Sequence, residues 1–135
     1  MCLPGWPLLF HHLYYVLSMK KNYRLALTLD LKGDLRSREE YIKLHKAVWP
    51  EIKASILQAG IIDMNIYNFG NRLFMVMQVD ESFSFERKVA LDAVNSKVQE
   101  WEELMWKYQK PIAGAKSGEK WVLMDEIFSL KDDTQ

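Results

Sequence analysis

The sequence predicts an α+β fold with the element order strand, helix, strand, strand, helix, strand. Apolar and polar residues alternate over residues 23–31, 62–67 and 73–79, which is the pattern of half-buried strands. Apolar residues recur at helical spacing after the first and third of these stretches. WVLMDEIFSL (residues 121–130) is expected to be the last strand. This order predicts a ferredoxin-like βαββαβ domain, with two helices on one face of a four-stranded antiparallel sheet.

The first helix is predicted from about Arg38 to Ala59. Ser37 and Glu40 have the spacing of a capping box at its start. Gly60 suits the C′ position after its last turn. The caps therefore predict one long helix between the first two strands.

Pro50 lies inside this predicted helix. Proline removes a backbone donor and clashes with the carbonyl four residues back, and it pushes the preceding residue, Trp49, out of α geometry. We therefore expect the helix to kink or to restart at Pro50. A bend there would open space on the sheet side for a small molecule, although a kink without function fits the sequence equally well.

A hairpin and a second helix follow. NFGN (residues 68–71) is a turn signal between two alternating stretches, which predicts a β-hairpin. The second helical region covers roughly residues 85–110 and ends before Pro111. Five of its apolar residues form one stripe at spacings of three and four: Val94, Val98, Trp101, Met105 and Tyr108.

The sheet face away from the helices is predicted to be partly apolar. Its apolar residues are Val76, Val122, Met124 and Phe128. Soluble monomers rarely expose large apolar patches, so we expect a homodimer formed through the sheet faces. Cover by the chain's own loops and tail is the alternative.

Length and charge favour one domain without a polyanionic partner. The chain has 135 residues, and its 18 basic residues balance its 18 acidic residues. This balance argues against binding to nucleic acid. Cys2 is the only cysteine, which excludes an intrachain disulfide and fits a reducing cytoplasm.

The N-terminal stretch MCLPGWPLLFHHLYYVLS (residues 1–18) differs from the rest of the chain. It lacks the positive start and the cleavage site of a secretory signal, and it is too short and broken to span a membrane. MKKNYR, from Met19, resembles a natural protein start. We therefore expect residues 1–18 to be an extension outside the fold, the domain to cover residues 19–130, and residues 131–135 to form a loose tail.

Tyr41 and His45 are the main candidates for chemistry. At 100° per residue they lie four positions apart on the apolar side of the first helix, together with Val48, Ile52 and Ile56. Burial would lower the pKa of His45 and leave a neutral imidazole, which can act as a general acid or base. A core histidine that only bonds a backbone carbonyl is the competing interpretation, and helical spacing alone favours it.

Other residues allow a sugar site but no metal site. Aromatic side chains stack on sugar rings, and the candidates are Trp49, Tyr67, Trp101, Trp106 and Tyr108, each of which could equally be a core residue. One histidine and no cysteine after residue 18 cannot build a usual zinc site, and no Gly-rich phosphate loop is present. We therefore expect no metal and no cofactor.

EEYIKLHKAVWPEI (residues 39–52) resembles the signature of the L-rhamnose mutarotases, which have a tyrosine four residues before a histidine and then Trp-Pro-Glu. YRLALTLDLK, NIYNFGNRLFMVMQVD and WEELMWKYQKP are also similar to that family, so the resemblance covers roughly residues 21–130. It implies a dimeric α+β barrel that interconverts the α and β anomers of a free sugar, most readily L-rhamnose, without metal or cofactor.

The resemblance also implies the site. His45 would be the catalytic residue, and Tyr41 would bind the sugar. A tryptophan pair of the family falls at Trp101 and Glu102, and a further tyrosine falls at Met64, so these three positions are substrate-binding candidates with two departures from the family pattern. The alternatives are a different small-molecule enzyme on the same barrel, such as a cofactor-free oxygenase, and a non-catalytic sugar-binding module.

Overall fold

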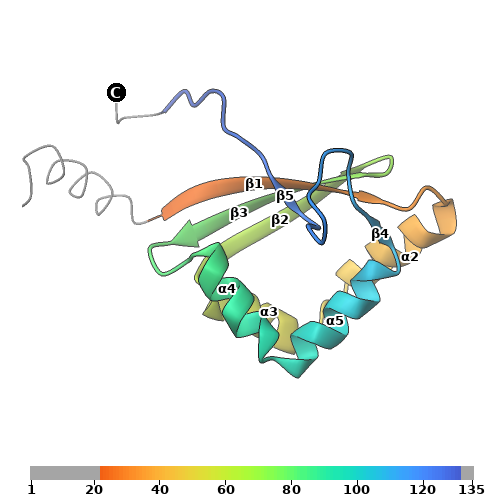
Figure 1. Cartoon of the computed structure of the whole chain (residues 1–135), viewed down its shortest axis with the longest axis horizontal. Helices are drawn as coiled ribbons and strands as arrows, with labels where there is room; N and C mark the ends of the chain where they lie inside the picture. The colour runs from red at the N-terminus through yellow and green to blue at the C-terminus, as the bar shows by residue number, and fades with distance from the viewer. Residues whose placement is uncertain (1–21, 132–135) are drawn as a thin grey trace, which may run out of the picture.

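The computed structural model describes residues 22–131, so the predicted extension (residues 1–18) and residues 132–135 of the predicted tail lie outside the described residues. The described chain is an α+β domain in which the helices lie on one face of an antiparallel sheet (Figure 1). The elements in chain order are β1 (Asn22–Leu31), α2 (Leu35–His45), α3 (Pro50–Gln58), β2 (Ile61–Phe69), β3 (Arg72–Asp80), α4 (Phe85–Ala93), α5 (Ser96–Trp106), β4 (Gln109–Lys110) and β5 (Val122–Leu123).

The sheet has the strand order β2-β3-β1-β4, with β5 also paired to β1. This confirms the predicted ferredoxin-like fold, but the fourth strand position is divided. β4 pairs with the end of β1 at Asp30 and Leu31, whereas β5 pairs with its middle at Leu27 and Thr28. The loop of residues 111–121 separates the two short strands. The predicted last strand over residues 121–130 was therefore too long, because the chain leaves the β1 edge just after Met124 donates to the Ala26 carbonyl.

The predicted first helix is two helices. Asp34, not Ser37, caps α2, because its carboxylate accepts from the backbone N–H of Ser37. Trp49 has φ −57° and ψ 138°, outside α geometry, and Pro50 begins α3. The predicted restart at Pro50 is thus confirmed, since the first helical position needs no N–H donor.

The predicted second helix is also divided. α4 ends at Ala93, and Asn95 caps α5 by accepting from the backbone N–H groups of Lys97 and Val98. The prediction placed Val94 on the buried stripe, which was wrong, because Val94 lies at the break between the helices and is 85% exposed.

The core lies between the sheet and the helices. Inward residues of β1, β2 and β3, with Ala59 after α3 and Phe83 after β3, form one end of the core: Leu27, Ala59, Ile61, Met75, Met77, Val79 and Phe83. Residues of the helices α2, α3 and α5 and of the strands β1 and β3 form the other end: Leu31, Tyr41, Ile52, Leu73, Val98, Trp101 and Met105. This packing holds the helix face that carries Tyr41 against the sheet.

Apolar side chains also lie on the outer face of the sheet and beyond it. Phe74 packs against Tyr67, with ring centroids 6.4 Å apart, and Tyr67 is 59% exposed. The segment after β5 runs away from the sheet (Figure 1), and its side chains are mostly exposed at Ile127, Phe128 and Leu130. Within residues 22–131, no helix has the length and apolar character needed to span a bilayer.

Candidate active site

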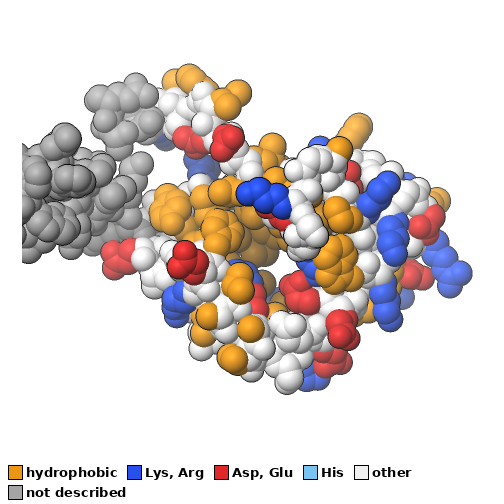
Figure 2. Space-filling model, viewed as in Figure 1, with side chains coloured by type: hydrophobic (Ala, Val, Ile, Leu, Met, Phe, Trp, Pro, Cys, Tyr) orange, Lys and Arg blue, Asp and Glu red, His pale blue; other side chains and the backbone are white. Residues whose placement is uncertain are grey.

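A cavity of about 730 Å³ lies between the sheet and the helices. All five predicted site residues line it: Tyr41, His45, Met64, Trp101 and Glu102. Figure 2 shows a hollow with hydrophobic side chains between the sheet and α4, with acidic and basic side chains near its rim. The fold therefore brings together residues that are as far as 61 positions apart in the sequence (from Tyr41 to Glu102).

His45 is oriented by its own helix. Its Nδ1 lies 2.9 Å from the backbone carbonyl oxygen of Tyr41, and this oxygen can only accept a hydrogen bond. Nδ1 of the neutral imidazole therefore carries the proton, and Nε2 keeps its lone pair. Burial lowers the pKa of His45, while the bond to the Tyr41 carbonyl opposes this effect. The ring is thus a neutral base near pH 7, and its Nε2 has no hydrogen-bond partner among the residues that the structure describes.

Tyr41 is a buried phenol that remains protonated. Its side chain is 2% exposed, and burial raises its pKa to about 12. The negative charge of Glu102 adds to this shift, whereas a hydrogen bond from Gln109 opposes it. Gln109 Nε2 donates to the Tyr41 hydroxyl over 3.4 Å. At neutral pH the Tyr41 hydroxyl is therefore a hydrogen-bond donor and not an anion.

Aromatic rings hold the imidazole in place. The Tyr41 ring lies 4.2 Å from the His45 ring between centroids, and Trp101 meets His45 edge-on at 5.6 Å. Trp49, the cap of α3, packs edge-on against Trp101 at 5.0 Å. The interruption between α2 and α3 thus places the Trp49 ring behind Trp101, the residue that contacts the imidazole.

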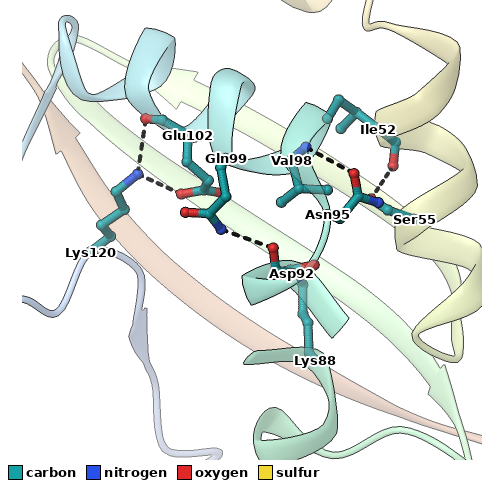
Figure 3. A network of polar contacts seen from close by, with 9 residues as sticks. All are labelled: Ile52, Ser55, Lys88, Asp92, Asn95, Val98, Gln99, Glu102 and Lys120. Carbon is teal, nitrogen blue, oxygen red and sulfur yellow. Dashed lines mark hydrogen bonds and ion pairs between the residues drawn. The ribbon is translucent and has the colours of Figure 1, made fainter. Parts of the chain in front are cut away.

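Glu102 is tied to the loop between β4 and β5. Lys120 Nζ donates to the Glu102 carboxylate at 2.5 Å and to its backbone carbonyl at 3.3 Å (Figure 3). The same Nζ lies 4.5 Å from the Trp106 ring centroid. The Glu102 carboxylate is therefore paired with a lysine and lies beside the cavity.

Sequence reasoning missed several polar residues of the cavity. Gln109 and Lys88 line it, and Lys120 reaches it through Glu102. Lys88 pairs with Asp92 on α4 at 2.5 Å (Figure 3). No local motif marks these positions, because each reaches the cavity through the packing of distant elements. Tyr67 lies on the outer face of the sheet beside Phe74 and does not line the cavity.

The arrangement suits proton transfer on a polar ligand. A neutral imidazole lies beside a protonated phenol, and both line a cavity with aromatic and aliphatic walls. Such a pair can take a proton from one ligand oxygen and hold another oxygen by hydrogen bonding. Among the residues that the structure describes, no three His, Cys, Asp or Glu side chains are grouped to hold a metal ion.

Comparisons with known proteins support one family. The family model of L-rhamnose mutarotase matches residues 24–130. The L-fucose mutarotase of Xanthomonas campestris is 41% identical over 111 residues, which cover 81% of this chain and 89% of that protein. The L-rhamnose mutarotase of Listeria monocytogenes is 30% identical over 98 residues, or 70% of this chain and 86% of that protein.

A solved structure supports the same fold. The crystal structure of an L-rhamnose mutarotase from Formosa agariphila is similar with a TM-score of 0.60 and 20% identity. The match covers 81% of this chain and 99% of that chain. Sequence and fold therefore agree with the resemblance carried by Tyr41, His45 and the Trp-Pro-Glu stretch. The chain belongs to the L-rhamnose mutarotase family, whose members are isomerases.

Proposed function

We propose that this protein is a mutarotase that interconverts the α and β anomers of a free 6-deoxy-L-hexose. The observation that carries the proposal is the neutral His45 ring, which lines the cavity, has its Nδ1 bonded to a carbonyl and has no hydrogen bond at Nε2 within residues 22–131. Membership of the family supports the reaction type.

His45 is the proposed proton carrier. Nε2 takes the proton from the hydroxyl at C1, the C1–O5 bond breaks, and the electron pair of that bond moves to O5. The protonated imidazole then gives its proton to O5, which yields the open-chain aldehyde. Because O1 and O5 are both bonded to C1, one imidazole can serve both atoms. Rotation about C1–C2 and the reverse steps give the other anomer, so the imidazole ends neutral as it began.

Tyr41 is the proposed donor that holds the sugar, and Trp101 is the proposed stacking surface. The phenol is protonated at neutral pH because burial raises its pKa to about 12, so it donates to a sugar oxygen without losing its proton. Aliphatic side chains such as Met64 line the cavity and suit the methyl group of a 6-deoxy sugar.

L-Fucose is the proposed sugar ahead of L-rhamnose. The 41% identity to an L-fucose mutarotase supports L-fucose, whereas the sequence resemblance had favoured L-rhamnose. The two sugars differ in the configurations at C2 and C4. Glu102 lies beside the cavity where the family pattern has a second tryptophan, and a carboxylate there can accept a hydrogen bond from a sugar hydroxyl, whereas an indole can only donate one.

Saturation-transfer NMR of anomer exchange tests the function. We expect acceleration of both L-fucose and L-rhamnose, with L-fucose faster. L-Galactose, which differs from L-fucose only by a hydroxyl on C6, should be slower by up to about 10²-fold, because an apolar wall rejects an added hydroxyl weakly. Binding of these sugars without faster exchange would instead indicate a sugar-binding module, and oxygen uptake with another substrate would indicate the oxygenase alternative.

A homodimer formed through the sheet faces is part of the proposal. Phe74 and Tyr67 are exposed on the outer face, and the segment after β5 carries apolar side chains away from its own domain. A second copy would cover both surfaces. Light scattering should detect a dimer that Phe74→Glu dissociates, whereas Leu35→Glu, at an exposed position on α2, should leave it intact. A monomeric wild-type protein would refute this part.

The cytoplasmic location, which rests on the single cysteine of the sequence, also stays a prediction.

A further inference from the structure

Gln109 is a buried polar residue of the cavity wall. It is 4% exposed, and its backbone is held in β4, where it pairs with Leu31 of β1. Its Nε2 donates to the Tyr41 hydroxyl, and this is the side chain's only hydrogen bond within residues 22–131. Its Oε1 is buried without a partner in the same described part of the chain.

Burial of this amide opposes folding. A buried amide that leaves one polar atom unpaired costs free energy, whereas an apolar side chain of similar length would fill the same space without that cost. Packing therefore does not explain a glutamine at this position. The bond to Tyr41 is the one interaction that distinguishes Gln109 from a methionine, so the role of Gln109 lies with the phenol.

The bond sets the direction of the phenol proton. The amide nitrogen Nε2 can only donate hydrogen bonds, so the Tyr41 hydroxyl oxygen must be the acceptor of this bond. The single proton of that hydroxyl then points away from Gln109. Both side chains line the cavity, so the direction left open for the proton includes the space that a ligand would occupy.

We propose that Gln109 is a positioning residue: its amide occupies the acceptor side of the Tyr41 hydroxyl and directs the hydroxyl proton toward a sugar oxygen in the cavity. This inference rests on the proposed function. Without the amide, the hydroxyl proton rotates freely, and the hydrogen bond to the sugar is formed from fewer of its orientations.

The first test needs no sugar. A donor to the phenol oxygen stabilises the phenolate, so Gln109→Met should raise the pKa of Tyr41, and Gln109→Glu should raise it further. The pKa is read from ¹³C NMR of labelled tyrosine, with Tyr41→Phe to assign the signal. The control is Gln99→Met, a residue exposed on α5 whose amide donates to the Asp92 carbonyl. An unchanged or lowered pKa in Gln109→Met would overturn the proposal, because the amide would then not be the donor.

The second test is a double-mutant cycle on anomer exchange. Gln109→Met should lower kcat/KM about five- to tenfold, as expected for one hydrogen bond, and should leave thermal stability unchanged or raised. In the Tyr41→Phe background the same change should have no further effect. Equal losses in both backgrounds would show that Gln109 acts without Tyr41 and would overturn the proposal.

If Gln109→Met folds poorly, Gln109→Leu replaces it in both experiments. If the wild-type protein accelerates no sugar, the proposed function fails, and the NMR titration of Tyr41 still decides the direction of the hydrogen bond. Gln109→Glu with wild-type exchange would also contradict the proposal, since a carboxylate would draw the Tyr41 proton toward itself and away from the sugar.

Discussion

His45→Asn removes the free imidazole nitrogen and keeps much of the local structure of α2. The shorter amide places a donor near the position of Nδ1, so the hydrogen bond to the Tyr41 carbonyl can form in the variant. The basic Nε2 is lost. A positioned proton transfer contributes about 10²–10⁴-fold, which is about 2.7–5.4 kcal/mol of activation free energy, and we expect kcat/KM to fall by this amount. The lost ring contacts with Tyr41 and Trp101 should cost about 1 kcal/mol of stability.

Saturation-transfer NMR of L-fucose measures this loss, and thermal unfolding of the same samples checks the fold. His45→Gln is the matched control, because its amide reaches the Nε2 position without being basic, and it should be as inactive as His45→Asn. Since burial lowers the pKa of His45, wild-type exchange should persist below pH 6.5 and fall only at lower pH, when the ring is protonated. A folded His45→Asn protein that exchanges anomers within about twofold of wild type would refute this reasoning.

Three further changes test the structure around the site. Tyr41 has a pKa of about 12 in the fold against an unfolded value of 10, so the unfolded state ionises first, and wild-type stability should fall by about 2 kcal/mol between pH 10 and pH 12. Tyr41→Phe should lack this fall in urea unfolding at each pH. Gly60 has φ 93°, and a Cβ there would lie 2.5 Å from Ser82 Oγ, so Gly60→Ala should lose about 2 kcal/mol; a loss under about 0.5 kcal/mol would contradict the strain. Asn95→Ala removes the cap of α5 and should cost about 1 kcal/mol, whereas Asn95→Asp should retain most of the stability.

Local patterns predicted much of the fold. The alternation over β1, β2 and β3 identified these strands, because side chains of a strand face the core at every second residue. Gly60 was predicted at a helix end and has the positive φ that such a position favours. Helix boundaries were predicted less well. Both long helices are divided, since the caps Trp49 and Asn95 lie between stretches whose apolar residues continue the same spacing.

Part of the candidate site was also evident from the sequence. A spacing of four on one helix brings Tyr41 and His45 together in any fold that keeps the helix, and their ring centroids are indeed 4.2 Å apart. The resemblance added Trp101, Glu102 and Met64, and the fold places them around the same cavity. Their roles in sugar binding stay predictions.

The sequence by itself determined the strands β1, β2 and β3, the hairpin and the Tyr41–His45 pair, because each depends on spacing over a few residues. Only the tertiary structure decided that Gln109 meets the Tyr41 hydroxyl, 68 positions away, and that Lys120 holds Glu102 from a loop. It also decided that this loop divides the fourth strand. These contacts depend on how the sheet edge, α2 and α5 pack, and no local pattern of residues encodes the distance between elements that meet only in the folded chain.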